Sequence, residues 1–400
     1  MNAKHLNSYL TLQKLVSKKL REASKKQSIT VWAGLGSPTY IFSGFDETLV
    51  PIYPQLGNVV QGKEHVAKVL QTAASLGYNS DLCSDLRCEI GSQQVKGGLR
   101  SRIVDPDFVL GMNFTCSTEV ALYHSWVQQY PGVEHYIIDS PALIGEDVPQ
   151  NTVEYIKKQL IELIEKIEKS TGLPFNMDKF RKAAVNTSRS YNLMNKITSL
   201  AAHNPSPICL TNFQPFLLPV AYYPHYDVTY EYLLELEQEL EQTIKTSTEK
   251  KERIRLCWDF LPLYKYMNDI HELLSKYDAK IVASTSLTTA MEWPVPELFE
   301  NTSDVLELLS QAFAQHHFKR NYRYKTNTLL DWIKTYKIDG MIFHSARNCK
   351  AHSLSHFLIK EELEKAIGIP SVVFEADMLD PAAYSKSQIF NRLEAFLETM

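Results

Sequence analysis

Short apolar runs alternate with helical segments in two separate blocks of this 400-residue chain. Neighbouring parallel strands need a crossover of a dozen or more residues, and helices in such crossovers cover the faces of the sheet. The pattern therefore predicts an α/β fold with two parallel sheets, and the length favours two packed domains over one. The expected strands begin at Ile29, Leu49, Phe108 and His135 in the first block, and at Ile254, Ala279, Gly340 and Pro370 in the second.

Helical periodicity dominates the chain before and between the two blocks. Apolar residues at helical spacing predict an N-terminal amphipathic helix up to about Lys26 and further helices between Asn151 and about Thr248. A Pro-containing stretch from Asn204 to Pro224 interrupts these helices. We therefore divide the chain into an N-terminal helical segment (1–28), a first α/β domain (29–150), a helical connector (151–252) and a second α/β domain (253–400).

The composition argues against several classes of partner. Lys and Arg number 42 against 46 Asp and Glu, so no basic surface for nucleic acid or an anionic membrane is expected. The N-terminus lacks the apolar stretch of a signal peptide and no apolar run is long enough to span a bilayer, so a cytoplasmic location is expected. Six Cys are too sparse for a disulfide framework, and in a reducing cytosol such thiols are buried, catalytic or metal-bound.

Three of these cysteines stand in strand-to-helix contexts. Cys116 and Cys349 each follow an apolar strand, which places them at the carboxyl edge of a sheet, where open α/β folds bind ligands. Cys83 is expected at the start of a helix in the first domain. Helix N-termini favour thiolates, so the three could ligate one iron–sulfur cluster in the cleft between the domains and leave one iron open for substrate. None belongs to a CxxC pair, so a buried apolar thiol is the alternative for each.

The remaining cysteines and motifs point to chemistry less directly. Cys88 lies about 140° around a helix from Cys83, and Cys209 and Cys257 stand in apolar runs typical of a core. The sequence contains no GxxxxGK[ST], HExxH or GxSxG motif. The run from Gly34 to Ser37 is only a fragment of a dinucleotide-binding fingerprint.

Three segments resemble the motifs of a known family. The run from Gly340 to Leu354 around Cys349, followed by the segment from Gly368 to Pro381, is similar to the C-terminal signature of the 2-hydroxyacyl-CoA dehydratase and benzoyl-CoA reductase family. The segments Gly77-Tyr-Asn-Ser-Asp-Leu-Cys83-Ser and Asn113-Phe-Thr-Cys116 match its other two cysteine motifs. The resemblance extends over nearly the whole chain, and the three motifs in this order are fairly specific together.

The resemblance implies two Rossmann-like domains and an oxygen-labile 4Fe-4S cluster held by Cys83, Cys116 and Cys349. The implied activity is that of a lyase, a 2-hydroxyacyl-CoA dehydratase from anaerobic metabolism. In such dehydratases an ATP-hydrolysing iron–sulfur activator injects one electron, and the acyl-CoA becomes a ketyl radical anion that expels its 2-hydroxyl group. The implied partners are an acyl-CoA substrate, this activator, and a paralogous second subunit or a second copy of the chain.

The surroundings of Cys349 resemble the larger, substrate-binding type of subunit. Ser37 falls where that subunit presents a Ser near the substrate, and Gln55 falls where several dehydratases have Glu. A neutral amide cannot act as a carboxylate base, so either another residue removes the proton or the elimination mechanism differs. A polar loop residue with no catalytic role is the alternative for Gln55.

Other activities stay open at this point. Within the family, a low-potential reductase of the benzoyl-CoA reductase type is one alternative, and a double-cubane enzyme, which would recruit six thiolates, is another. The extra thiolates would have to come from Cys88, Cys209 and Cys257. A non-catalytic electron-relay or scaffold subunit is an alternative of another class, and a cluster-free α/β protein with three buried Cys is the simplest.

Overall fold

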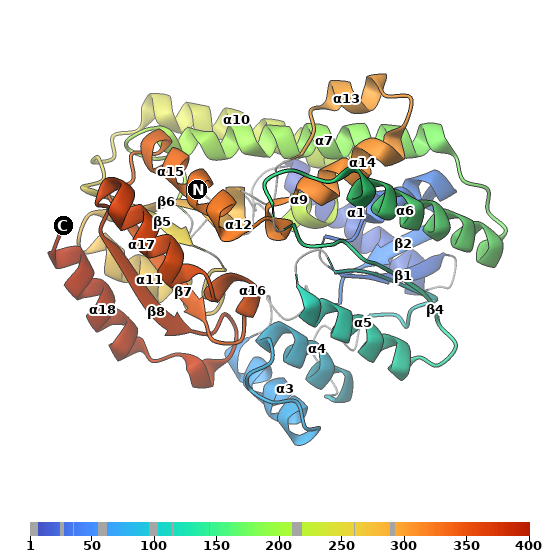
Figure 1. Ribbon diagram of the computed structural model, residues 1–400, viewed down its shortest axis with the longest axis horizontal. Helices are drawn as coiled ribbons and strands as arrows, with labels where there is room; N and C mark the ends of the chain where they lie inside the picture. The colour runs from blue at the N-terminus through green and yellow to red at the C-terminus, as the bar shows by residue number, and fades with distance from the viewer. Residues whose placement is uncertain are drawn as a thin grey trace.

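The structure is a computed structural model that describes residues 7–24, 28–34, 36–54, 62–95, 103–113, 116–143, 145–209, 218–259, 261–288 and 293–400. Within these ranges, eight strands form two four-stranded parallel sheets with the orders β2-β1-β3-β4 and β6-β5-β7-β8 (Figure 1). Helices lie between the two blocks of strands and at the N-terminus. The predicted α/β fold with two parallel-sheet domains is therefore confirmed, whereas the exact domain boundaries stay predictions.

The strands lie where the apolar runs placed them. Two begin one residue from their expected starts, β4 at Glu134 and β8 at Ser371. The first sheet consists of β1 (Ile29–Ala33), β2 (Leu49–Ile52), β3 (Phe108–Met112) and β4 (Glu134–Ile138), and the second of β5 (Ile254–Asp259), β6 (Ala279–Ser284), β7 (Gly340–Ala346) and β8 (Ser371–Ala376). The side chains of β3 and β5 are buried along their whole length, as expected for central strands covered by helices on both faces.

Both sheets have the same topology. β1 pairs with β2 on one side and with β3 on the other, all parallel, and β5 pairs in the same way with β6 and β7. The direction of the crossovers therefore reverses between β1 and β3, and again between β5 and β7. In open α/β sheets, ligands bind at the carboxyl ends of the strands at such a switch point. The chain has two of these positions, one in each sheet.

The helices cover the sheets and join them. None in the described part of the chain is both long and apolar enough to cross a membrane. The longer ones are α1 (Asn7–Ser24), α3 (Lys63–Ser75), α4 (Ser84–Gln94), α5 (Ser117–Gln129), α6 (Gln150–Thr171), α7 (Met177–Ser199), α10 (Asp227–Thr246), α11 (Met267–Ser275), α14 (Val305–Gln315), α15 (Tyr322–Thr335), α17 (His356–Ile367) and α18 (Lys386–Glu398). Short ones are η2 (Thr39–Thr48), η4 (Leu200–Ala202), α9 (Leu218–Tyr222), α12 (Thr285–Thr288), α13 (Pro296–Asn301), η7 (His317–Lys319), α16 (Lys350–Ser353) and η8 (Pro381–Ala383).

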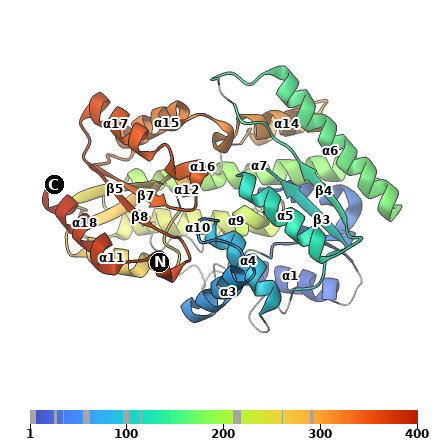
Figure 2. The ribbon, with the colours of Figure 1, turned by 60° about the horizontal axis from the view of Figure 1, so that its bottom comes forward.

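Helix α7 runs along both halves of the molecule (Figures 1 and 2). Asn176 caps it, because its side-chain oxygen accepts a hydrogen bond from the Lys179 amide at 3.0 Å. Near its N-terminus, Phe180 and its neighbours pack into the core of the first sheet. Near its C-terminus, Met194 and Ile197 pack into the core of the second sheet. One helix thereby fixes the relative position of the two sheets.

A second crossing joins the halves in the opposite direction. α13 and α14 lie between β6 and β7 in the sequence, yet Phe299 and Phe313 pack into the core of the first sheet together with α6. The chain then returns through η7 to α15, which packs against α17 beside the second sheet. Helical periodicity predicts these helices but does not say which sheet they cover, because both cores accept the same apolar stripe.

Tyr123 on α5 packs against two glycines of the first sheet. A Cβ atom on Gly111 would lie 2.2 Å from Tyr123 Cδ2, and one on Gly34 would lie 1.9 Å from the Tyr123 hydroxyl. Both distances are far inside van der Waals contact, so the two positions accept only glycine while the ring stays in place. The ring of Tyr123 is completely buried and thereby sets how closely α5 approaches β1 and β3.

We expect Gly111→Ala to destabilise the fold by about 1–3 kcal/mol, because the added methyl overpacks the Tyr123 ring. Gly145→Ala is the matched control, since a Cβ there meets no atom within 4 Å. Its free energy of unfolding should stay within about 0.5 kcal/mol of wild type. Urea unfolding followed by circular dichroism measures both values. Equal stabilities of the two variants would contradict the packing described for Tyr123.

Candidate functional site

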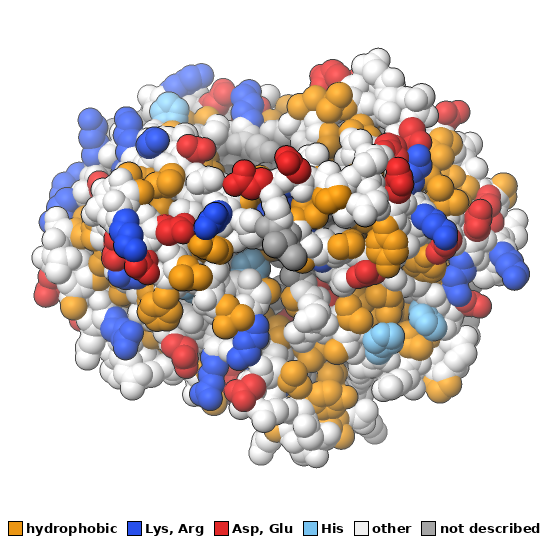
Figure 3. Space-filling view, viewed as in Figure 1, with side chains coloured by type: hydrophobic (Ala, Val, Ile, Leu, Met, Phe, Trp, Pro, Cys, Tyr) orange, Lys and Arg blue, Asp and Glu red, His pale blue; other side chains and the backbone are white. Residues whose placement is uncertain are grey.

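The three cysteines singled out from the sequence occupy the same kind of position. Cys83 is the N-cap of α4, Cys116 the N-cap of α5 and Cys349 the N-cap of α16. All three are partly buried free thiols. α4, α5 and α16 lie near one another at the centre of the molecule in both ribbon views (Figures 1 and 2). The face of the molecule shown in Figure 3 is hollowed at this centre, between the two halves.

Each sulfur faces the amides of a helix start. Burial raises the pKa of each thiol, and nearby helix amides oppose this rise: those of Leu86 and Asp85 at Cys83, those of Glu119 and Thr118 at Cys116, and that of His352 at Cys349. None of the three thiols forms a capping hydrogen bond within the described part of the chain. Unpaired amide N–H groups at a helix N-terminus stabilise negative charge, which is the property a thiolate ligand needs. The expectation that all three thiols stand at helix starts is confirmed.

The three thiols also influence one another across the two halves. Burial raises the pKa of Cys349 to about 12, and the neighbouring charge of Cys116 adds to this rise. Burial, the Asp85 carboxylate and the charge of Cys349 together hold the pKa of Cys83 well above its ordinary value. Cys349 is thus close enough to both other thiols to destabilise a shared negative charge. Bound cations would reverse this repulsion, since a coordinated thiol loses its proton.

The arrangement differs from a site for one metal ion. Among the described residues, no three His, Cys, Asp or Glu side chains come close enough together to hold a single ion. In a cubane cluster each thiolate binds its own iron, so three thiolates have to surround a common volume without meeting at one point. Three thiols from two domains, each at a helix start, meet this second requirement, because the charges of Cys116 and Cys349 interact and so do those of Cys349 and Cys83.

Ser37 lies beside the same centre, after β1 at the switch point of the first sheet. It is 8% exposed, and its Oγ lies 3.5 Å from the Leu110 carbonyl of β3. Burial, Glu119 and Cys116 raise the pKa of Tyr123, and the nearby Ser37 hydroxyl lowers it. Ser37 and Cys116 therefore both lie near the Tyr123 hydroxyl.

Gln55 lies outside the described residues. Tyr53, two residues before it, follows β2 and is held in place, because its hydroxyl lies 2.6 Å from Thr39 Oγ1 and donates to the Tyr222 carbonyl at 2.9 Å. The chain that leads to Gln55 is therefore anchored at Tyr53.

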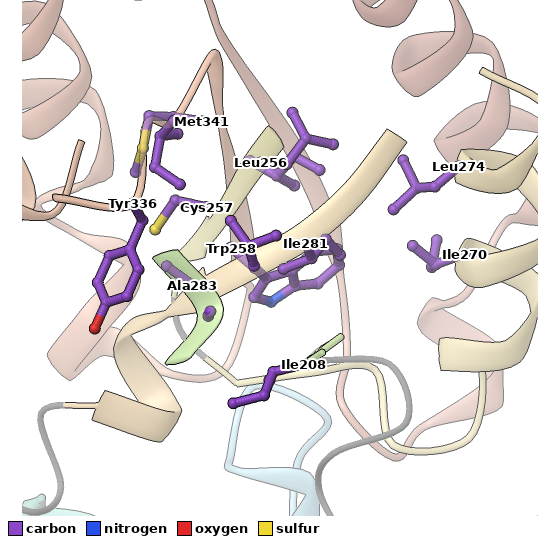
Figure 4. Packing of buried hydrophobic residues seen from close by; sticks show 14 of the residues in the cluster. Ile208, Leu256, Cys257, Trp258, Ile270, Leu274, Ile281, Ala283, Tyr336 and Met341 are labelled. Carbon is purple, nitrogen blue, oxygen red and sulfur yellow. The ribbon is translucent and has the colours of Figure 1, made fainter. Parts of the chain in front are cut away.

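The other three cysteines have different surroundings from these three. Cys257 is fully buried on β5, between Met341, Tyr336 and Ala283 (Figure 4). Cys88 is fully buried between apolar side chains of α3 and Met378 and Leu379 of the second half, in a cluster against which Cys83 packs. Cys209 is half-buried and hydrogen-bonded to His271. Core packing, as expected from the sequence for Cys257, accounts for both fully buried thiols.

An ionic cluster that the sequence did not indicate occupies the switch point of the second sheet. Asp259, the last residue of β5, is completely buried, and its carboxylate lies 2.8 Å from Lys325 Nζ and 3.2 Å from His356 Nε2. Thr285 donates to its other oxygen at 2.7 Å. Burial opposes the charge of Asp259, but Lys325 and His356 outweigh it and hold the pKa of the carboxyl far below its ordinary value.

A second buried lysine lies at the edge of the first sheet. Lys319 in η7 donates to the main-chain and side-chain oxygens of Asn113, which follows β3. Asn113 in turn accepts from the Ser140 amide at 2.6 Å and donates to Asp139, so it joins the ends of β3 and β4. Burial lowers the pKa of Lys319 to about 8, although Asp139, Glu119 and Cys116 oppose this shift.

One buried and one exposed ion pair join the two halves of the molecule near Cys83. Arg87 on α4 pairs with Asp380, which follows β8, at 2.8 Å, and both side chains are largely buried. Arg347 and Asp81 form an exposed pair at 3.4 Å in the same region. The start of α4 is therefore attached to the second half although α4 belongs to the first.

Comparison with known proteins decides the family. A family model described as "2-hydroxyglutaryl-CoA dehydratase, D-component" matches residues 41–400. The chain belongs to this family.

Relatives in the 2-hydroxyglutaryl-CoA dehydratase family are distant but match along most of the chain. Lactoyl-CoA dehydratase subunit alpha of Anaerotignum propionicum is 22% identical, over 100% of this chain and 97% of that protein. The (R)-2-hydroxyisocaproyl-CoA dehydratase alpha subunit of Clostridioides difficile is 24% identical, over 92% and 89%. A benzoyl-CoA reductase subunit of Thauera aromatica is 23% identical, over 82% and 79%. The resemblance read from the three cysteine motifs is confirmed.

We expect Asp259→Asn to destabilise the protein by about 3–5 kcal/mol at pH 7, because it leaves Lys325 buried without its counter-ion. The folded-state pKa of Asp259 is depressed, so its contribution is present above the unfolded-state pKa of about 3.9 and is lost as the pH falls. The difference in unfolding free energy between wild type and variant should therefore shrink between pH 5 and pH 3. Urea unfolding at several pH values measures it.

Asp331→Asn is the control for this experiment, because Asp331 is an exposed carboxylate on the same helix as Lys325. Its stability at pH 7 should equal that of wild type within about 0.5 kcal/mol. A pH-independent loss in Asp259→Asn would show that the carboxylate does not carry the charge described here.

Proposed function

We propose that this chain is the iron–sulfur subunit of a 2-hydroxyacyl-CoA dehydratase-like enzyme, a lyase, with a 4Fe-4S cluster held by Cys83, Cys116 and Cys349. One observation carries the proposal. Three N-cap thiols from both halves lie near enough to perturb one another, in a chain whose relatives are dehydratase and reductase subunits. Thiolates at helix N-termini are suited to iron, and three of them leave one iron available to substrate.

The surrounding residues define what the protein itself contributes. When bound, the cluster would supply one electron, received from an ATP-hydrolysing activator, to the thioester of a 2-hydroxyacyl-CoA and would take it back once the hydroxyl group and a β-proton have left as water. The helix amides stabilise the thiolates, and the buried position of the site limits access of water. We assign to Ser37, at the first switch point, a hydrogen bond to a substrate oxygen, and its position near Tyr123 and Cys116 supports this assignment. The protein would therefore contribute by orienting the substrate and by stabilising charge at the site.

Partners follow from the same proposal. Relatives such as the lactoyl-CoA and 2-hydroxyisocaproyl-CoA dehydratase proteins are named alpha subunits, which supports a second subunit for this chain as well. We propose a paralogous subunit or a second copy of the chain, together with an acyl-CoA substrate and the activator.

A reductase is the second candidate. It rests on the similarity to the benzoyl-CoA reductase of Thauera aromatica and on Gln55, which cannot act as the carboxylate base of an elimination. The double-cubane variant has less support, because Cys88 and Cys257 are buried in separate apolar clusters. Iron content separates the two cluster types, since a single cubane contains about four irons and a double cubane about eight.

We expect anaerobically reconstituted wild type to bind about four irons and four sulfides per chain. Ala substitutions of Cys83, Cys116 or Cys349 should each lower this content by more than half, because only two protein thiolates remain. Cys209→Ser is the matched control and should bind as much iron as wild type, since Cys209 lies apart from the three. Iron and acid-labile sulfide determination measures all five proteins.

The EPR spectrum of the reduced protein then tests the function. A signal that changes when a 2-hydroxyacyl-CoA is added supports a substrate-facing cluster, and a change only with aryl-CoA thioesters favours the reductase. An unchanged signal with every thioester would favour an electron-relay or scaffold subunit. Wild type that binds no iron would refute the cluster.

Ser37→Ala should leave iron content unchanged and weaken the thioester-dependent EPR change. The loss of one hydrogen bond to substrate corresponds to about 5–10-fold weaker binding of the acyl-CoA. A titration of the EPR change with the thioester gives the dissociation constant of each protein. Equal constants in Ser37→Ala and wild type would remove Ser37 from the substrate site.

A further inference from the structure

The segment between η7 and α15 joins the two switch points of the molecule. Helix α14 packs in the core of the first sheet, and α15 packs against α17 beside the second. The chain therefore passes from one half to the other between residues 316 and 321, and Figure 1 shows α14 and α15 over different halves. Lys319 lies within this passage, on the side of the first sheet, and Lys325 follows it on α15.

Lys319 is held beside the first sheet by neutral groups. It is 7% exposed, its ammonium contacts the two oxygens of Asn113, and its carbonyl accepts from the Leu143 amide at 2.7 Å. Across the part of the chain that the structure describes, Lys319 forms no salt bridge. Asn113 stands three residues before Cys116 in the same loop. The Asp139 and Glu119 carboxylates act on Lys319 from nearby but form no salt bridge with it in the described part of the chain, so they compensate its field only in part.

Lys325 is held beside the second sheet by an ion pair. Asp259, fixed by Thr285 and His356, lies 2.8 Å from its ammonium, so the long side chain has one position. Cys349 and α16 follow β7, the strand next to β5. In the pairing of β5 with β7, Asp259 stands opposite Phe343, and the chain runs on from there to Cys349. The ammonium of Lys325 is therefore fixed at the strand end that leads to the proposed cluster ligand of the second half.

We propose that Lys319 and Lys325 are positioning residues that fix a positive charge on each side of the cluster and thereby favour its reduced state. The inference rests on the proposed function, because it requires the cluster between Cys83, Cys116 and Cys349. A cluster with three thiolates is an anion whose negative charge grows by one on reduction. Cations fixed in a poorly hydrated site stabilise the more negative form, and net charge nearby is one of the determinants of cluster potential.

A purely structural role predicts something different. If Lys325 only attached α15 to β5, its replacement would lower stability and leave the cluster potential unchanged. If Lys319 only joined η7 to Asn113, the same would hold. The potential is therefore the quantity that distinguishes a fixed charge from a structural contact.

The experiment compares Lys319→Met and Lys325→Met with Lys334→Met after anaerobic reconstitution. Lys334 is exposed on α15 and serves as the matched control. EPR-monitored redox titration gives the ratio of reduced to oxidised cluster at one fixed potential. We expect this ratio to fall about tenfold in each of the first two variants and to stay at the wild-type value in the control. Lys325→Arg keeps the charge and should restore the wild-type ratio.

The outcomes separate this inference from the proposed function. Variants that keep full iron content and the wild-type ratio overturn the role of the lysines and leave the cluster intact. Iron lost from the Met variants but kept in Lys319→Arg and Lys325→Arg supports the charge, because an anionic cluster then needs it for binding. Iron lost from Met and Arg variants alike indicates a structural role. Wild type that takes up no iron removes the proposed function and this inference together.

Discussion

The packing of α7 against both cores is the constraint on which the centre of the molecule depends. Phe180 lies in the core of the first sheet and Ile197 in that of the second, on one helix of 23 residues. At 1.5 Å per residue the helix is about 35 Å long, enough to extend along two domains. A sheet attached to each end cannot rotate freely, so the carboxyl ends of β3 and β7 stay near each other. Without this rigidity, thiols on separate domains would have no defined spacing.

Two buried ion pairs at the centre of the molecule also help to position the two halves and the charges between them. Removing ions from water is costly, and a buried pair contributes little stability compared with apolar packing. The Arg87–Asp380 and Lys325–Asp259 pairs are therefore poorly explained as devices for stability alone. The first joins α4, which presents Cys83, to the second half. The second fixes a cation beside β7, which leads to Cys349. The first pair determines where Cys83 is placed, and the second determines where a charge lies beside the strand that leads to Cys349.

The sequence predicts the strands and the three N-cap cysteines because both depend on local patterns. Parallel strands are continuous apolar runs, and a Cys that follows such a run and precedes a helix can only lie at the carboxyl edge of the sheet. Lys319 and Lys325 could not be found in this way. Their importance comes from the return of the chain between the halves, and the helical stripe of α14 does not reveal which core it joins. Asp259 can be singled out in the sequence as an acidic residue at the end of an apolar strand. Its partners cannot be predicted in the same way, because they come from three other elements.

The two switch points have the same topology and different chemistry. After β1, the position is occupied by the small neutral Ser37, next to Tyr123 and Cys116. At the equivalent end of β5, Asp259 with its partners Lys325 and His356 fills the position with buried charge. A neutral thioester has no reason to displace an ion pair, because separating the pair leaves buried charges unpaired. Under the proposed function, the substrate would therefore bind at the first sheet, and the second sheet would hold one proposed ligand, Cys349, and a fixed charge. The two domains therefore differ in chemistry at equivalent positions: the first has a neutral switch point and the second a charged one.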